Sequence, residues 1–142
     1  MDDCLFCKFV NKELTPAIIY EDENTLAFLD IKPAGRLDGH TLIIPKKHYA
    51  TIEDIPEAEL TNLILITKKI AIAIKKYSGA TGINIISNNY PSAGQMVDHI
   101  HFHIVPRIEN DGIYYDSKRR DALQSGLLKV ASEIKEEISK TE

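Results

Sequence analysis

Residues 99–106, HIHFHIVP, alternate histidine with apolar side chains. Because the side chains of a β-strand point to opposite faces in turn, this alternation predicts a strand over residues 99–105. His99, His101 and His103 would then share one face, and the apolar residues between them would share the other. Burial of the apolar face in a core would leave three imidazoles side by side on the opposite face.

Packing alone is a poor explanation for three neighbouring imidazoles, because Leu or Val would fill the same space without bringing titratable groups together. Two chemical uses are open from the residues alone. Three imidazoles can hold a metal ion such as zinc. A neutral imidazole, with an unperturbed pKa of about 6.5, is also a competent nucleophile toward phosphorus near neutral pH.

The clearest helix is predicted over residues 56–78, with a cap at Asp54, an apolar stripe along one side and a stop at Gly79. The remaining predicted segments are helices over 4–12 and 117–138 and strands over 18–20, 25–30, 40–45 and 83–87, the first two of which form a hairpin. Strands arranged around one long helix indicate an α+β fold with an antiparallel sheet of about five strands.

The composition is that of a soluble globular protein, with 44% hydrophobic and 27% charged residues in a chain of 142. A single domain over 1–142 is expected. No apolar run approaches the roughly 20 residues that cross a bilayer, and the start, MDDCLFCKFVNKE, has acids where a secretory signal has basic residues. We therefore expect a cytoplasmic protein without a membrane partner. Residues 118–120 form the only tight basic cluster, so nucleic acid is an unlikely partner.

The only two cysteines, Cys4 and Cys7, form a Cys-x-x-Cys motif. In a reducing compartment this motif indicates half of a metal site or a redox pair rather than a structural disulfide. A thioredoxin-like redox motif follows a strand and opens a helix, but no strand is predicted before Cys4. The metal interpretation is therefore favoured.

Two longer blocks carry a family resemblance. Residues 94–106, GQMVDHIHFHIVP, resemble the signature of the histidine-triad (HIT) family, and residues 26–48, LAFLDIKPAGRLDGHTLIIPKKH, resemble its other characteristic block. The resemblance covers about residues 4–110, with a helical extension over about 117–138. It implies a HIT-type domain and a homodimer formed through the long helix and a strand.

The resemblance also implies roles for individual residues. His101 would be the nucleophile, His103 would contact the phosphate, and His40 would support the triad. The implied substrate-binding residues are Asp30 on the ribose hydroxyls, Asn88 in the phosphate loop, Gln95 near the leaving group and His103, with Ile18, Phe28 and Leu29 as candidates for the base pocket. Met96 stands where some family members carry serine near the leaving group.

The resemblance further implies a structural zinc ion held by Cys4, Cys7, His48 and His99, which would make His99 a ligand instead of a catalytic group. No catalytic cofactor is expected.

The implied reaction is attack of His101 on the α-phosphorus of a nucleotide, through a covalent nucleotidyl-histidine, to release a nucleoside monophosphate. Phosphoramidates, aminoacyl adenylates and dinucleoside polyphosphates are the implied substrates. The alternatives are a nucleotidyltransferase or phosphorylase, a nucleotide-binding module with little turnover, and a zinc-dependent hydrolase. Tyr114, Tyr115 and the last helix are expected to complete the core, the alternative being that they cover the partner's active site.

Overall fold

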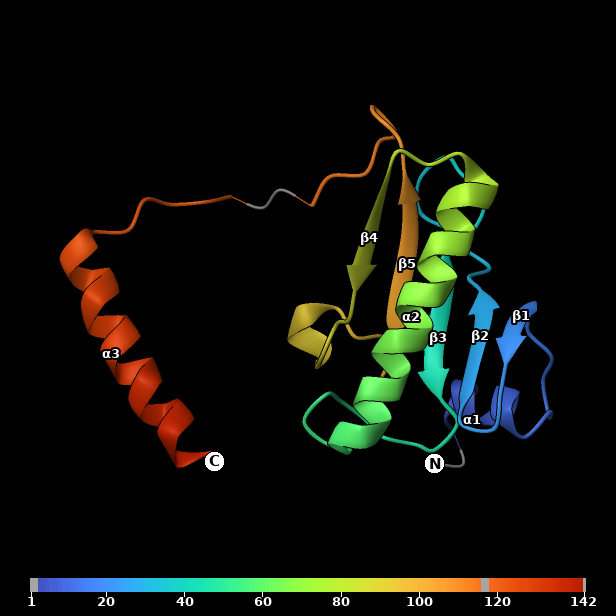
Figure 1. Cartoon of the computed structure of the whole chain (residues 1–142), viewed down its shortest axis with the longest axis horizontal. Coiled ribbons are helices and arrows are strands. Elements are labelled where there is room, and N and C mark those ends of the chain that lie inside the picture. Colours follow the sequence, from blue (N-terminus) through green and yellow to red (C-terminus); the bar gives the residue numbers. More distant parts are fainter. Residues whose placement is uncertain (1–2, 116–117, 142) are drawn as a thin grey trace.

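The computed structural model describes residues 3–115 and 118–141. Its elements, in chain order, are α1 (Leu5–Val10), β1 (Ile18–Glu21), β2 (Thr25–Leu29), β3 (Thr41–Pro45), α2 (Glu57–Ser78), β4 (Gly82–Ile86), the 3₁₀ turn η1 (Pro91–Ala93), β5 (Phe102–Arg107) and α3 (Gln124–Lys140). The five strands form one sheet in the order β1-β2-β3-β5-β4, and every neighbouring pair is antiparallel. The predicted α+β fold with one long helix is confirmed (Figure 1).

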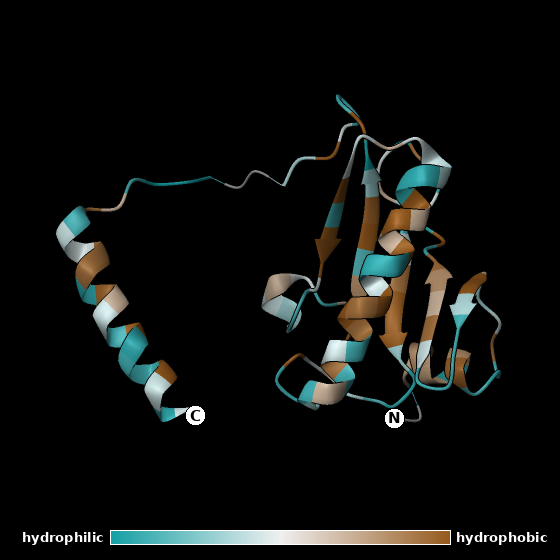
Figure 2. Cartoon of the chain, viewed as in Figure 1, coloured by the Kyte–Doolittle hydropathy of each residue, from teal (hydrophilic) through white to brown (hydrophobic). Residues whose placement is uncertain are grey.

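The central strands β2 and β3 are buried on both faces, so the sheet has a core on each side. On one face, Ala27 and Ile43 pack with residues of α2 such as Leu63 and Ile70. On the other face, Leu26, Phe28, Leu42 and Ile44 pack with Phe6 of α1. Because side chains alternate along a strand, adjacent residues of β3 belong to different cores. Figure 2, coloured by residue hydropathy, shows hydrophobic residues concentrated along the central strands and along parts of α2.

Helix α2 follows the predicted span closely but begins differently. Pro56 itself occupies the N-cap and makes no side-chain cap bond. The predicted cap, Asp54, instead accepts hydrogen bonds from the backbone N–H and the hydroxyl of Thr51, at 3.0 and 3.1 Å. The predicted stop is confirmed, because Gly79 takes the left-handed conformation, with φ of +73°, that glycine adopts without strain.

Strand β5 begins at Phe102 instead of the predicted His99. Before that point the backbone N–H of Ile100 donates to the carbonyl of Tyr49, at 2.7 Å, and not to a strand of the sheet. The alternation of side chains nevertheless continues through this stretch, since Ile100, Phe102 and Ile104 all pack in the core under α2. The three histidines therefore lie on the face away from α2.

The last helix corrects an expectation. It spans Gln124–Lys140 rather than 117–138, and residue 117 lies outside the described residues. None of its residues is buried, and it stands away from the sheet (Figure 1). An apolar stripe at helical spacing predicted the helix but could not tell whether the stripe packs on its own chain.

Over residues 3–115 and 118–141, the helices lack the combination of length and apolar composition that a membrane crossing requires.

Candidate active site

The central histidine of the triad, His101, is buried at the edge of the sheet face opposite α2. Its Nδ1 lies 2.7 Å from the carbonyl oxygen of His99. A carbonyl only accepts hydrogen bonds, so this contact places the ring proton on Nδ1. The other ring nitrogen, Nε2, then keeps its lone pair, which is the form that a nucleophilic imidazole needs.

A short hydrogen-bond chain fixes the neighbouring histidines. The backbone N–H of Ala34 donates to Nδ1 of His40 at 2.9 Å, so His40 carries its proton on Nε2. That Nε2 lies 3.0 Å from Nδ1 of His103, to which it donates. His103 consequently carries its own proton on Nε2 and has a donor left for a ligand.

Burial keeps these rings neutral. It lowers the pKa of His103 to about 4, with a further contribution from the neighbouring His101 and His40. Burial also lowers the pKa of His101 and of His40, and the negative charge of Asp30 opposes the shift in both. Near neutral pH the site therefore presents uncharged imidazoles.

A cleft of about 720 Å³ opens beside His101 and His103. Asp30, at the end of β2, and Asn88, after β4, line it, and its apolar wall includes Phe6, Phe9, Phe28, Leu29 and Leu42. Of the predicted base-pocket residues, Phe28 and Leu29 line this cleft, whereas Ile18 does not. Met96 is almost fully exposed at the rim.

The carboxylate of Asp30 lies where the cleft borders the histidines. Its Oδ1 accepts from the backbone N–H of Lys32 at 2.8 Å, and its Oδ2 lies 3.7 Å from Nε2 of His40. The carboxylate thus has accepting capacity left toward the cleft.

Gln95 lies elsewhere than expected for a substrate contact. Its Oε1 accepts from the N–H of Tyr90, its Nε2 donates to the carbonyls of Ala50 and Val97, and its own N–H donates to the carbonyl of Tyr90. Neither the side chain nor the N–H points into the cleft. Gln95 instead holds the loop that follows β4.

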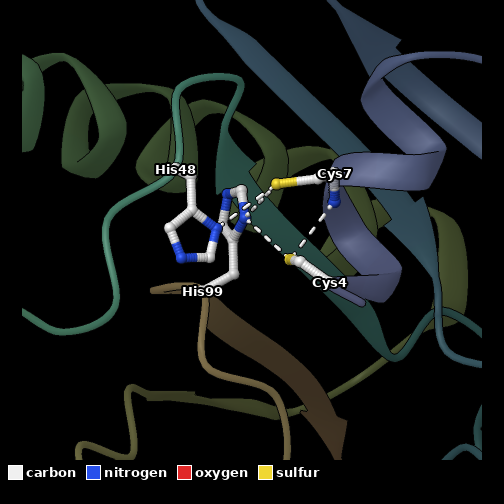
Figure 3. Close-up of side chains that lie close together, drawn as sticks. All are labelled: Cys4, Cys7, His48 and His99. Atoms are coloured by element: carbon white, nitrogen blue, oxygen red, sulfur yellow. Dashed lines mark hydrogen bonds between the residues drawn. The ribbon is translucent and has the colours of Figure 1, made fainter. Parts of the chain in front are cut away.

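The four residues expected to bind metal come together from three distant parts of the chain. Their candidate ligand atoms all lie within 4.8 Å of one another. Cys4 and Cys7 stand at the start of α1, His48 follows β3, and His99 precedes β5 (Figure 3). The contacts are 3.4 Å from Cys4 Sγ to His99 Nδ1, 3.3 Å from Cys7 Sγ to His48 Nδ1 and 3.6 Å from Cys7 Sγ to His99 Nδ1.

These separations fit tetrahedral zinc, for which metal–sulfur and metal–nitrogen bonds of about 2.3 and 2.0 Å place sulfur and nitrogen roughly 3.5 Å apart. The far nitrogen of His99, Nε2, lies 2.8 Å from the carbonyl of Pro45, the kind of outer contact that orients a metal-binding imidazole. Burial and the adjacent Cys4 raise the pKa of Cys7 to about 11, so without a metal its thiol is protonated near neutral pH, and a bound cation would have to displace that proton.

The three triad histidines therefore do not surround one metal ion, which a metal site made of three imidazoles would require. The ring of His99 faces the cysteines, and His101 and His103 face the cleft.

One contributor to the site was missed from the sequence. Phe6 packs edge-on against both His99 and His101, with ring centres 5.9 and 5.1 Å away, so it joins the cysteine cluster to the cleft. The apolar spacing in the first helix was a usable signal for Phe6.

Comparison with known proteins decides the family. The model for the HIT domain matches residues 11–110. The chain belongs to the HIT family. It is 50% identical to a HIT-like protein of Methanocaldococcus jannaschii over 77% of this chain and 82% of that protein. It is 33% identical to adenosine 5'-monophosphoramidase HNT1 of Candida albicans, over 98% of this chain and 93% of that protein.

Among the solved structures that resemble this chain, SMU.412c of Streptococcus mutans is 41% identical to it. It superimposes with a TM-score of 0.91, over 97% of this chain and 87% of that chain.

Proposed function

We propose that this HIT protein hydrolyses nucleotidyl substrates at the α-phosphorus, with His101 as the nucleophile and a nucleoside monophosphate as the product. The observation that carries the proposal is the contact of His101 Nδ1 with the carbonyl of His99, which leaves Nε2 unprotonated beside a cleft of nucleotide size. The C. albicans relative, named as an AMP phosphoramidase, acts on a substrate of this class.

The reaction has two steps. Nε2 of His101 attacks the α-phosphorus in line, and the bond from phosphorus to the leaving group breaks. The leaving group departs with the electron pair and takes a proton from solvent. Nε2–H of His103 donates to a phosphate oxygen and stabilises the charge that develops there. Water then attacks the same phosphorus, the P–N bond breaks, its electron pair returns to His101, and the proton of the water is released.

The substrate class that we propose is an adenosine or guanosine phosphoramidate, an aminoacyl adenylate or a dinucleoside polyphosphate. Asp30 would accept hydrogen bonds from the ribose hydroxyls, Phe28 and Leu29 would contact the base, and Asn88 would contact the phosphate. Inorganic phosphate in place of water would give a nucleoside diphosphate, so product analysis with added phosphate separates hydrolysis from phosphorolysis.

We also propose that Cys4, Cys7, His48 and His99 bind a structural zinc ion. Four protein ligands close the coordination sphere, so the ion would pin α1 to the sheet and take no part in the reaction. Ligand thiols persist in a reducing compartment, which supports the cytoplasm as the location of the protein.

A homodimer is proposed through the edge of the sheet at β4. This edge strand leaves Ile85 45% exposed, and Ile64 of α2 is 41% exposed. Pairing two such edges would cover apolar surface and satisfy the free backbone groups of the strand.

The proposed reaction is tested by rapid-quench incubation with an adenosine phosphoramidate, followed by intact-mass measurement. Wild-type protein should gain the mass of one AMP group and release AMP, whereas His101→Ala and His101→Gly should do neither. Comparable turnover by His101→Ala would show that His101 is not the nucleophile. Tight nucleotide binding without turnover by the wild type would favour a binding module.

A further inference from the structure

Helix α1 contributes side chains to two different sites. Cys4 is its N-cap and Cys7 lies in its first turn, and both thiols face the imidazoles of the proposed metal site (Figure 3). The phenylalanines of the same helix, Phe6 and Phe9, line the cleft beside His101. A single short helix therefore supplies half of the metal ligands and part of the wall of the cleft.

The polar contacts that attach α1 to the rest of the chain depend on its cysteines. Over the residues that the structure describes, the backbone hydrogen bonds of residues 4–14 stay within this segment. The side-chain hydrogen bonds that leave it run from the two thiols to His48 and His99. The ion pair of Lys12 with Glu21 is exposed and contributes little. Because a helix of six residues does not persist by itself in water, the position of α1 depends on these thiols and on its packing.

Phe6 is the side chain of α1 that contacts both sites. Its ring is 4% exposed, and its centre lies 5.9 Å from that of His99 and 5.1 Å from that of His101. It also packs at 5.4 Å against Phe28, which lines the same cleft. In a close-packed interior, a displacement of α1 moves this ring against its neighbours. Loss of the metal contacts would therefore disturb both the wall of the cleft and the surroundings of His101.

We propose that a metal ion bound by α1 raises the affinity of the cleft for a nucleotide, with Phe6 as the positioning residue that couples the two sites. The coupling rests on the proposed function and on the proposed metal site. Coordination of the two cysteines would hold α1 on the sheet and thereby complete the wall that contacts the nucleoside. A nucleotide packed on that wall would hold the same helix and keep the cysteines beside the histidines.

The coupling acts in both directions. By thermodynamic linkage, the factor by which metal raises nucleotide affinity equals the factor by which nucleotide raises metal affinity. Couplings between two sites of one protein are typically about 5- to 150-fold, and we expect a factor of about tenfold here.

Metal release in the presence and absence of AMP tests the coupling. Co²⁺ takes the place of Zn²⁺, because cobalt bound to thiolates absorbs visible light. The loaded protein is mixed with an excess of chelator, and calorimetry verifies separately that AMP binds it. Saturating AMP should slow the loss of absorbance by about tenfold, since differences in affinity arise mainly in dissociation rates. This measurement does not require metal-free protein to stay folded.

The outcomes separate the proposals from one another. If no cobalt–thiolate absorbance develops, the metal site is wrong, and if AMP does not bind the loaded protein, the proposed function is wrong. The coupling fails with either of them. If both ligands bind and the release rate is the same with and without AMP, the coupling alone is wrong.

Two matched variants test the role of Phe6. Phe6→Leu keeps an apolar side chain but shortens its reach toward both histidines. It should still bind Co²⁺ and AMP, but AMP should slow its metal release by less than about twofold. Phe9→Leu is the same change on the same helix, at a ring that packs on Phe28, and it should keep the full effect. Coupling that survives Phe6→Leu, or that both variants lose equally, would overturn the assignment of Phe6.

Asp30→Ala is the control for the place where AMP acts. This variant keeps α1 and the metal ligands intact but lacks the carboxylate proposed to bind the ribose. At the same AMP concentration, its metal release should be unchanged. Slowing of the wild-type extent in Asp30→Ala would mean that AMP acts outside the cleft, which would contradict the proposal.

Discussion

The carbonyl oxygen of His99 accepts the Nδ1 proton of His101 across 2.7 Å, while the ring of His99 lies among the thiols of Cys4 and Cys7. One residue thus belongs to the cysteine cluster through its side chain and to the cleft through its backbone. A shift of the backbone at His99 would move both the ring that faces the thiols and the carbonyl that orients the His101 imidazole. The two sites are chemically separate but mechanically joined.

Removal of the proposed zinc ion with a chelator should lower stability more than it lowers the chemical rate, because the four protein ligands would leave the ion no open position for the reaction. A ligand present at about a thousand times its dissociation constant contributes roughly 4 kcal/mol to folding, and we expect a loss of that order. Chelation should be measured by urea unfolding of wild-type protein and of Cys7→Ser. The variant should be destabilised already and should respond little to chelator. An unchanged unfolding midpoint in chelated wild type would argue against a structural metal.

Replacement of His40 should slow the reaction without weakening substrate binding. His40 fixes the proton of His103 on Nε2, so His40→Ala should reduce kcat by about 10- to 100-fold and leave KM nearly unchanged. His40→Gln, whose amide can still donate toward His103, should recover part of the loss. Steady-state kinetics of the three proteins checks this, and a rise in KM at constant kcat would instead make His40 a substrate contact.

Asp30 should strengthen substrate binding by accepting hydrogen bonds from the ribose hydroxyls. A hydrogen bond to a charged group contributes about 1.5–3 kcal/mol, so Asp30→Ala should raise KM by roughly 10- to 100-fold with an adenosine phosphoramidate. A 2′,3′-dideoxy substrate should bind the wild type as weakly and should lose nothing further with Asp30→Ala. Equal losses with both substrates would mean that Asp30 acts in another way, for instance through its electrostatic effect on the protonation of His40.

Stability should fall as the pH is lowered from about 6.5 to 4. Burial lowers the pKa of His103 to about 4, whereas an unfolded histidine has a pKa of about 6.5. The unfolded chain therefore binds this proton first, and the stability present above pH 6.5 is lost progressively below it. The shift corresponds to roughly 3 kcal/mol for this residue.

Urea unfolding of wild type and His103→Gln at several pH values in this range measures that dependence. The variant should show a shallower slope because it lacks this ring, and some slope should remain because His40 and His101 still titrate. Identical slopes for the two proteins would show that His103 is not buried as a neutral ring.

Two leucines of α2 provide a matched test of the core. Leu63 is 1% exposed under the sheet and Leu65, on the outer side of the same helix, is 61% exposed. Leu63→Ala should cost about 2–5 kcal/mol of unfolding free energy and Leu65→Ala less than about 0.5. Similar losses for both would mean that the outer side of α2 is covered as tightly as the inner side.

The sequence predicted what depends on local periodicity. The alternation around His101 placed the histidines opposite the core under α2, and the stripe of α2 with Gly79 defined the long helix. The cysteine cluster followed from the family resemblance, because residues 4 and 99 share no local pattern that could join them.

The remaining features depend on contacts between distant segments. The side-chain amide of Gln95 donates a hydrogen bond to the carbonyl of Ala50, 45 residues away. The ring of Phe6 contacts His101 only once α1 has packed on the sheet. The placement of α3 was wrong for a related reason, since an amphipathic pattern states that a helix packs and leaves its partner undefined.

Strand β3 sends adjacent residues into opposite cores, and His103 of β5 is paired with Leu42 while Phe102 is paired with Ile43. A single residue inserted between Thr41 and Pro45 would exchange these faces for the remainder of the strand. Such an insertion would bring Leu42 or Ile43 into the wrong layer and would set His103 against the wrong neighbour. Length changes should therefore be accepted in the loops of this architecture, whereas the strand lengths are as constrained as the identity of the histidines.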